Sequence, residues 1–366
     1  MSGVTVGIAG AGLLGRLLAW QLAHAGCEVS VFDPAPGPQP FFGGNGQVDA
    51  TPSERPCHAA GFSAAGMLSP LAELENAPPS IAALGWRSIA LWRDITHRLA
   101  QRPAFEECGS LMLAHRHDIG AAQRVLARLA TPGASGPQAR ALDAGELAAI
   151  EPSLQAVAHA WLLPGEAHID TVHTMQAMHA EAPSVAWHWS RPVIELAPHR
   201  LMLSDGDSRR FDIVFDVRGV GARPALPVRG VRGELVWLGL PRHGLTRPVR
   251  LLHPRQRVYL VPRSADLVVL GASEIESEDR SPPSLRTAVE LMSAAHSVMP
   301  SLAEARIVNL DSNLRPALPD NAPRIDATHG LVRINGLFRH GWLLAPALVD
   351  DALTACGIAP RELETT

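Results

Sequence analysis

The first apolar pattern in the chain is a short run over residues 4–9 that ends in the glycines of Gly10-Ala-Gly12-Leu-Leu-Gly15. A continuous apolar run closed by a turn signal is typical of a parallel strand covered on both faces. Leucines then recur at helical spacing over residues 17–22, and a second apolar run covers residues 29–32. The pattern therefore predicts a strand, a tight glycine turn, a helix and a second strand.

The rest of the chain alternates between helical and strand periodicities. Helices are predicted at residues 81–99, 121–129, 171–180, 284–299 and 343–356, with a short one capped by Asp143. Strands are predicted at residues 109–114, 160–163, 193–196, 200–203, 211–215, 234–238, 247–252, 258–261, 267–270, 306–310 and 331–335, and a turn at 204–208 joins two of them. In the helix at 284–299, the residues expected to face inward are Leu285, Val289, Met292 and Val298.

The order of these elements predicts an α/β fold, α+β overall. The chain begins with alternating strands and helices, has a mixed and largely antiparallel middle, and closes with a strand–glycine–helix unit. A Rossmann-like nucleotide-binding domain and a second, substrate-binding domain account for this order. We expect both to be discontinuous, the first formed by residues 1–80, 142–220 and 312–366, and the second by residues 81–141 and 221–311.

Two segments without clear periodicity follow the second strand. Residues 34–57 are rich in proline and glycine, which predicts a loop that is either a spacer or a flap over the nucleotide. Residues 58–68 are mostly small. Such a run either packs tightly as the start of a helix or lets the backbone press against a flat ligand.

Composition narrows the classes of function. The chain has 366 residues, 46% of them apolar, which is enough for a full core and more than one domain. The net charge of −4 and the absence of a basic stretch argue against a nucleic-acid partner. No apolar segment reaches membrane-spanning length, and the start of the chain lacks the features of a signal peptide. We therefore expect no integral membrane segment and a cytoplasmic location.

The cysteines and histidines show no metal-binding spacing. Cys27, Cys57, Cys108 and Cys356 are scattered, without a C-x-x-C pair, and are expected to be free thiols in a reducing compartment. None of the sixteen histidines lies in a ligand pattern such as H-E-x-x-H. The sequence predicts no metal site.

The glycine turn carries the clearest chemical signal. In the G-x-G-x-x-G spacing, Gly10 permits the sharp turn, Gly12 lets the backbone approach a diphosphate, and Gly15 allows close packing of helix on strand. The helix that follows presents unpaired N–H groups and a positive dipole to the phosphates. Asp33 ends the second strand, at about the 20-residue distance typical of a carboxylate that binds a ribose hydroxyl. The motif predicts a dinucleotide site without choosing between FAD and NAD.

The chain resembles the D-amino-acid-oxidase-like family of FAD enzymes, and within it the glycine oxidases of thiazole (thiamin) biosynthesis. The resemblance extends over nearly the whole chain and rests on six segments in order: Gly10-Ala-Gly12-Leu-Leu-Gly15, Ala64-Ala-Gly66-Met67-Leu68, Val258-Tyr259-Leu-Val-Pro262-Arg263, Gly271-Ala-Ser273, Leu314-Arg315-Pro316 and Gly336-Leu-Phe-Arg339-His-Gly341-Trp-Leu-Leu-Ala-Pro346.

The resemblance implies FAD bound in an extended conformation, and noncovalently, since no cysteine matches a covalent flavin linkage. The positions implied in FAD binding are Gly10, Gly12, Leu13, Leu14, Gly15, Asp33, Pro34, Ala60, Gly61, Ala65, Gly66, Met67, Val193, Gly219, Leu337, Phe338, Arg339, His340, Gly341, Trp342 and Leu343. The helix that opens at Gly341 would direct its positive end at the negative charge that gathers on a reduced flavin.

The resemblance also implies a site for a small amino acid. Arg315 matches the arginine that binds the substrate carboxylate, Tyr259 the tyrosine that adds a hydroxyl, and Arg339 a second active-site arginine. Glu274 stands where a relative has an apolar residue. Its carboxylate either binds the substrate ammonium or lies at the rim.

The expected reaction is the oxidative deamination of glycine, sarcosine or a D-amino acid. Hydride transfer from the α-carbon to the flavin gives an imine that hydrolyses to an oxo acid, and molecular oxygen reoxidises the flavin with formation of hydrogen peroxide. A homo-oligomer is compatible with the sequence. The alternatives are a flavin-dependent dehydrogenase with a different acceptor, an NAD-linked dehydrogenase, and a flavin-binding scaffold without activity.

Overall fold

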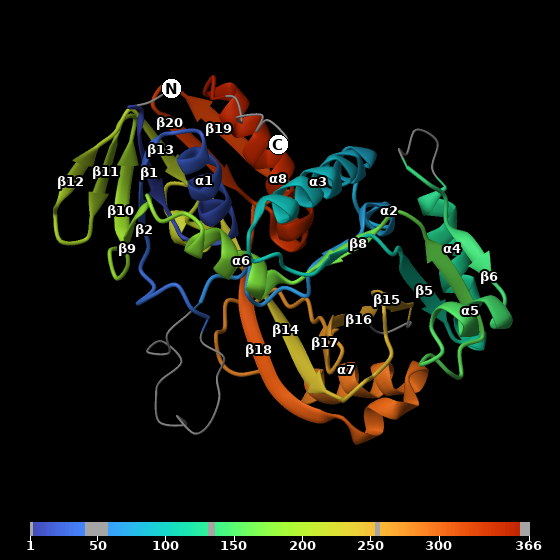
Figure 1. Cartoon of the computed structure of the whole chain (residues 1–366). Coiled ribbons are helices and arrows are strands. Elements are labelled where there is room, and N and C mark those ends of the chain that lie inside the picture. The colour runs from blue at the N-terminus through green and yellow to red at the C-terminus, as the bar shows by residue number, and fades with distance from the viewer. Residues whose placement is uncertain (1–2, 41–57, 131–135, 253–256, 359–366) are drawn as a thin grey trace.

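The structure is a computed structural model that describes residues 3–40, 58–130, 136–252 and 257–358. Two large sheets dominate it, one in the upper and one in the lower half of Figure 1. The upper sheet has six strands in the order β19-β20-β13-β1-β2-β9. Their bounds are Arg324–Thr328, Leu331–Asn335, Ile213–Asp216, Thr5–Ala9, Glu28–Phe32 and Ala186–His188. All neighbours are parallel except β19 and β20.

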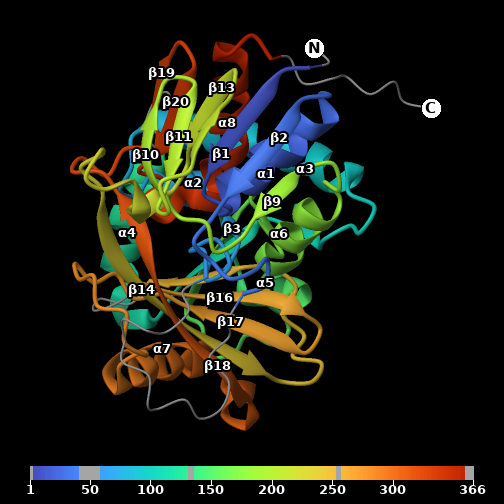
Figure 2. The same ribbon diagram turned by 90° about the vertical axis from the view of Figure 1, so that its left-hand side faces the viewer.

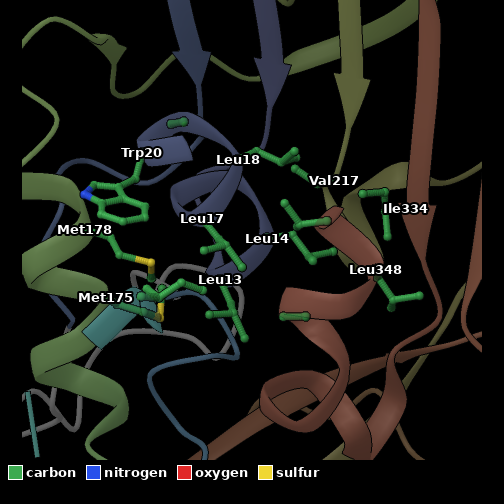
Figure 3. Close-up of a cluster of buried hydrophobic side chains, with 14 of the residues drawn as sticks. Leu13, Leu14, Leu17, Leu18, Trp20, Met175, Met178, Val217, Ile334 and Leu348 are labelled. Atoms are coloured by element: carbon green, nitrogen blue, oxygen red, sulfur yellow. The ribbon is translucent and has the colours of Figure 1, made fainter. Parts of the chain in front are cut away.

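Helices cover one face of this sheet. They are α1 (Leu13–His24), α3 (Pro79–Arg98), α6 (Thr171–Ala180) and α8 (Gly341–Ala355). Figure 3 shows α1 between its neighbours: Met175 and Met178 of α6 pack on one side, and Leu348 of α8 lies on the other. The leucines of α1 have the helical spacing needed to contact both neighbours. The first turn of α1 is therefore held in place by packing.

A small antiparallel sheet covers the opposite face. It consists of β10 (Val193–Ala197), β11 (Arg200–Leu203) and β12 (Ser208–Arg210). Val193, Leu201 and Leu203 pack with Val214 and Phe32 of the main sheet. Covered in this way on both faces, β1 and β13 are almost entirely apolar, as parallel strands usually are.

The second large sheet has eight strands in the order β18-β14-β17-β16-β15-β5-β7-β6. Their bounds are Arg306–Ala317, Arg229–Gly239, Leu267–Gly271, Arg257–Ser264, Val249–Leu252, Ser110–Ala114, His159–Leu163 and Arg140–Leu142. All neighbours are antiparallel except β5 and β15. One face packs against α7 (Leu285–Val298), and the other faces the six-stranded sheet, as the two views in Figures 1 and 2 show.

Short elements connect the two halves. Three strands form a third sheet, β3 (Met67–Leu68), β8 (Ala167–Ile169) and β4 (Phe105–Glu106). The remaining α-helices are α2 (Pro70–Glu73), α4 (Ile119–Leu129) and α5 (Ala144–Ile150). Single 3₁₀ turns lie at Arg116–Asp118, Gly219–Ala222, Pro300–Glu304 and Phe338–His340.

The predicted fold class is confirmed, and each predicted helix and strand is present, although β14 and β18 are several residues longer than the predicted strands at 234–238 and 306–310. The helix caps are also confirmed: Asp143 accepts from the Glu146 N–H and Asp170 accepts from the His173 N–H. Several short elements were not predicted, namely the strands β3, β4, β6, β8, β9, β12 and β19 and the helix α2. Of these, β12 lies where only a turn and a loop were expected before residue 211. Residues 41–57, with Cys57 and most of the predicted flap, lie outside the described residues.

The expected inward face of α7 is wrong in part. Leu285 is 81% exposed and Val289 is 50% exposed, whereas Val298 is buried as expected. The buried face is formed by Ala288, Leu291, Ala295 and Val298. These positions follow the three- and four-residue steps of a helix, and a shift of two residues from Leu291 to Val289 turns a side chain to the opposite side.

The domain boundaries stay a prediction, and the packing favours different ones. The α3 residues Ile89, Trp92 and Ile95 belong to the same buried cluster as α1 and α8. The segment from β6 to β7, by contrast, belongs to the eight-stranded sheet. We therefore propose that residues 79–98 form part of the nucleotide-binding domain and residues 140–163 part of the substrate-binding domain.

The sequence predicted neither a membrane-spanning segment nor a metal site, and the described part of the chain was searched for both. None of its helices combines the length and apolarity that a membrane span requires. No group of three or more potential metal ligands occurs among the described residues. The described cysteines, Cys27, Cys108 and Cys356, are free thiols.

The observed phase of α7 leads to a stability prediction. Leu291→Ala should lower the free energy of unfolding by about 2–5 kcal/mol, since it removes a side chain that is buried against the eight-stranded sheet. Leu285→Ala, a matched change on the same helix, should stay within about 0.5 kcal/mol of the parent. Urea unfolding measures both. Equal losses would show that the helix presents a different face to the sheet.

Candidate functional site

A cavity of about 1050 Å³ lies between the two large sheets, at the carboxyl ends of β1, β2 and β13. This edge is where open α/β sheets bind their ligands. The volume is at the upper end of the range of about 300–1,000 Å³ for small-molecule sites. Of the positions expected to bind cofactor or substrate, all line this cavity except Gly15 and His340.

The glycine turn forms one end of the cavity. Gly10 has φ +108°, and a Cβ there would lie 2.7 Å from the carbonyl oxygen of Val217. A Cβ at Gly15 would overlap the carbonyl oxygen of Gly10, which explains why Gly15 serves packing and does not line the cavity. Gly12 caps α1 without a side-chain hydrogen bond, and Leu13 and Leu14 follow on the cavity wall. The first N–H groups of α1 are therefore available to an anion.

Asp33 lies beside this turn. One carboxylate oxygen accepts a hydrogen bond from the Ala11 N–H at 2.6 Å, and the other accepts from the Ala35 N–H at 2.8 Å. Asp33 thereby holds the glycine turn and the loop after β2 in register. Because the carboxylate also lines the cavity, a ribose hydroxyl can reach it.

Arg218 lines the same end of the cavity as the glycine turn, and its contacts were not predicted from the sequence. Its guanidinium pairs with the buried carboxylate of Asp216 at 2.9 Å. Another terminal nitrogen donates to the carbonyl of Val193 at 2.9 Å. The arginine therefore joins β13 to β10, and Gly219 follows it on the cavity wall.

The small-residue segment at 58–68 forms the middle of the cavity wall. Gly66 has φ +80°, and a Cβ there would overlap the carbonyl oxygen of Ile169. The buried Arg263 donates to the carbonyls of Ala64 and Ala65 at 3.3 and 3.2 Å. Trp342 donates to the carbonyl of Gly61 at 2.9 Å. These bonds fix a strip of backbone with few side chains, as the flat-ligand interpretation requires.

The start of α8 borders the same space. Leu337, Phe338 and Gly341 line the cavity, and a Cβ at Gly341 would meet no atom within 4 Å. Phe338 has φ +50°, a conformation that bulky residues rarely adopt. The helix begins at Gly341, two residues before the predicted start. Its positive end therefore lies at the cavity.

The face of the eight-stranded sheet supplies Tyr259 and Arg315. A Cβ at Gly271 would lie 2.5 Å from the Tyr259 ring, and one at Gly233 would overlap the Arg315 guanidinium. Both side chains therefore lie flat on the sheet, over positions that only glycine can occupy. Glycine inside a strand commonly marks such a close approach, and this signal could have identified Gly233 from the sequence.

Tyr259 and Arg315 also contact each other. Arg315 donates to the Ser273 carbonyl at 3.0 Å, and its guanidinium lies close enough to Tyr259 for its charge to act on the phenol. Burial raises the pKa of Tyr259, although the charge of Arg315 acts in the opposite direction. The phenol is thus protonated at neutral pH and can donate a hydrogen bond into the cavity.

A second charged cluster lies at the start of α8. Glu73, which the sequence did not single out, accepts from Arg339 at 3.2 Å and lies 3.3 Å from Nδ1 of His340. Burial lowers the pKa of His340, which favours a neutral imidazole. Glu274 is 51% exposed in its side chain and lies 4.0 Å from Arg339, at the edge of the cavity.

A family model described as FAD dependent oxidoreductase matches residues 5–350 of the chain. The chain belongs to this family. It is therefore an enzyme of the FAD-dependent oxidoreductases, and the family that the motifs indicated is confirmed.

Individual relatives agree with this assignment. The chain is 35% identical over 349 residues to a thiamine biosynthesis oxidoreductase, ThiO, of Rhizobium etli, and the match covers 93% of each chain. The crystal structure of glycine oxidase from Geobacillus kaustophilus is similar with a TM-score of 0.79 and 23% identity, covering 99% of this chain and 97% of that one. Iminodiacetate oxidase from Chelativorans sp. BNC1 has a TM-score of 0.77 and 22% identity, covering 98% of this chain and 96% of that one.

The glycine turn leads to a prediction about cofactor retention. Gly12→Val should give protein without flavin, because its side chain would project toward the space beside the first turn of α1. The nearest atom to a Cβ at Gly12 is 3.7 Å away, so the fold should tolerate the change. The absorption band at about 450 nm relative to protein measures bound flavin.

Gly37→Val provides the control, because a Cβ at Gly37 meets no atom within 4 Å and Gly37 does not line the cavity. This variant should purify with its flavin. Yellow protein from Gly12→Val would contradict a close approach of the cofactor to Gly12.

Proposed function

We propose that the protein is an oxidase of small amino acids, of the glycine-oxidase type, that uses noncovalently bound FAD. The observation that carries the proposal is the convergence of Tyr259 and Arg315 on the same cavity that the small-residue segment ending at Met67 lines. A carboxylate binds an arginine and a hydroxyl donor in this arrangement with charge-assisted hydrogen bonds. The names of the relatives from Rhizobium and Geobacillus support glycine as a substrate and thiazole (thiamin) biosynthesis as the role.

The cavity fits FAD. Its extended shape, the uncapped start of α1 and the carboxylate of Asp33 suit a diphosphate and a ribose at one end. Ala65, Gly66 and Met67 would lie against the isoalloxazine, and the start of α8 would border its pyrimidine side. None of the cysteines that the structure describes lines the cavity, which supports noncovalent binding.

The chain's own residues would bind and orient the substrate. Arg315 and Tyr259 would hold its carboxylate, so that the α-carbon hydrogen points at the flavin. Such positioning can lower a barrier by up to about 7–11 kcal/mol. FAD supplies the chemistry, in that it accepts a hydride from the α-carbon and passes the electron pair to oxygen, which forms hydrogen peroxide.

Other groups would have supporting roles. Glu274, close to Arg339 at the rim, would attract the substrate ammonium. Glu73 would hold Arg339 in place. No acid–base side chain is needed for hydride removal once the amine is neutral, and the resulting imine hydrolyses in water to an oxo acid and ammonia.

Because the chain belongs to the FAD-dependent oxidoreductases, we no longer consider the alternative of an NAD-linked dehydrogenase. A dehydrogenase that passes electrons to a carrier differs from an oxidase only in the reoxidation step. The free thiols of the described cysteines support a cytoplasmic location. A homo-oligomer stays a proposal.

The activity can be tested by anaerobic mixing of the holoenzyme with glycine, sarcosine and D-alanine, with the flavin absorption as readout. We expect at least one of them to bleach the flavin, and admission of air to restore the colour with stoichiometric peroxide. Bleaching without peroxide would identify a dehydrogenase. A flavin that none of these compounds bleaches would contradict an oxidase of small amino acids.

The glycine beneath Arg315 provides a second test. Gly233→Ala should raise KM for the amino acid about 10- to 100-fold, since the new methyl group displaces the guanidinium and weakens hydrogen bonds worth about 1.5–3 kcal/mol. The flavin content should be unchanged. Steady-state kinetics by the peroxide assay measures KM.

Gly239→Ala, on the same strand β14, is the matched control. A Cβ there would meet the exposed side chain of Val308 at 3.0 Å, which has room to move, and the carbonyl oxygen of Arg306 at an ordinary contact distance of 3.9 Å. If Gly233→Ala kept the parental KM, Arg315 would not bind the substrate carboxylate.

A further inference from the structure

We propose that Arg250 forms a second carboxylate subsite, so that the preferred substrates include amino acids with two carboxylates, such as N-carboxymethyl amino acids. The inference rests on the proposed function, because it places the second carboxylate next to the one held by Arg315 and Tyr259. The name of one structural neighbour, iminodiacetate oxidase at 22% identity, contains a diacid of this class, but neither that name nor the sequence motifs assign a role to Arg250.

Arg250 lies beside Tyr259 on the sheet. It belongs to β15 and is directly opposite Tyr259 of β16 in the antiparallel register. Side chains opposite each other in such a pair are on the same face, with their Cβ atoms about 4.5–5.5 Å apart. Tyr259 is in turn opposite Gly271 of β17. The face that carries the proposed carboxylate clamp therefore continues to Arg250, which also lines the cavity.

The charge of Arg250 has no carboxylate partner among the described residues. No hydrogen bond or ion pair of its side chain is found there, and its Nε is buried without a hydrogen-bond partner. Arg339 differs, since Glu73 neutralises it. A cation that is partly removed from water without an anion is costly, and a bound anion removes this cost.

The buried carboxylate of Glu166 does not take this place. One of its oxygens accepts from the Ala72 N–H at 2.9 Å, and the other accepts from the Ser110 hydroxyl. No hydrogen bond or ion pair joins Glu166 to Arg250, although the charge of Arg250 acts on this carboxyl. Burial is the larger effect and raises the pKa of Glu166, which disfavours its charged form. In the described ranges, three other carboxylates line the cavity outside the glycine turn. Glu73 contacts Arg339 and His340, Glu274 is half-exposed near Arg339, and Glu290 is exposed on α7.

The two arginines lie on either side of Tyr259. Arg315 reaches it from β18 across the glycines of β14 and β17, and Arg250 approaches it from β15. A monocarboxylate can occupy only one of these positions. A substrate with a second carboxylate on its amine or side chain can pair with both cations, and its neutral amide cannot.

Ligand binding to the holoenzyme tests this independently of turnover. The probes are thiodiacetate, with two carboxylates, and (methylthio)acetate, with one, neither of which has an amine to oxidise. Their Kd values come from changes in the flavin absorption spectrum. We expect thiodiacetate to bind the parent protein at least tenfold more tightly, a preference that Arg250→Met abolishes and Arg250→Lys keeps in part.

The control variant is Arg286→Met, which removes an exposed arginine that also borders the cavity. It should keep the preference for thiodiacetate. Equal affinity of the parent for the two probes would overturn the subsite. So would a preference that survives Arg250→Met, or one that Arg286→Met removes to the same extent.

Turnover separates this inference from the proposed function. With iminodiacetate and its monoamide as substrates, the parent should show a higher kcat/KM for the diacid, and Arg250→Met should lose at least tenfold more with the diacid than with the amide. If thiodiacetate binds preferentially but no amino acid bleaches the flavin, the subsite stands and the amino-acid oxidase proposal fails. If glycine is oxidised but the preference for thiodiacetate is absent, the amino-acid oxidase proposal stands and the subsite is overturned.

Discussion

A large flat ligand can lie against a polypeptide backbone only where side chains are absent, and the cavity of this protein depends on that constraint at both ends. At one end, Gly10 and Gly12 leave the first turn of α1 open to a diphosphate. At the other, Gly233 and Gly271 make room for the Arg315 guanidinium and the Tyr259 ring to lie flat on the eight-stranded sheet. A side chain at Gly12 would project into the space of the ligand, and one at Gly233 or Gly271 would overlap a binding residue. A side chain at Gly10 would meet the backbone of Val217 and disturb the turn itself.

The two sheets must also keep a fixed distance from each other. A buried arginine holds a segment between them, since Arg263 of the eight-stranded sheet binds the carbonyls of Ala64 and Ala65. A second arginine, Arg218, joins β13 of the six-stranded sheet to β10 of the small sheet that covers it. An arginine suits this task because its planar guanidinium donates several hydrogen bonds at once in a fixed geometry. Removing such a charge from water is unfavourable, and burial accordingly lowers the pKa of Arg263. Backbone segments from distant parts of the sequence are thus fixed around one cavity.

Local sequence patterns were sufficient for much of this arrangement. The glycine turn, the strand that ends at Asp33 and the caps at Asp143 and Asp170 are determined by neighbouring residues, and their structures agree with the predictions. The phase of α7 was predicted wrongly because Leu285 and Val289 are apolar but exposed, and the buried positions include the small residues Ala288 and Ala295. Glu73, Arg218 and Arg250 were missed for a different reason. Their contacts depend on strand register and on packing between elements far apart in the chain, which periodicity does not encode.

The distribution of charge in the cavity depends on which elements supply the charged side chains. Arg339 and Glu73 come from different ends of the chain and neutralise each other at the start of α8. Arg315 and Arg250 come from strands of one sheet, on which Tyr259 and the glycines lie between them, and neither pairs with a carboxylate among the described residues. The sheet therefore presents positive charge to the cavity, whereas the helix side is close to neutral. An anionic substrate would be drawn to the sheet, in the part of the cavity that the small residues from Ala64 to Met67 also line and where they leave space for the flavin ring.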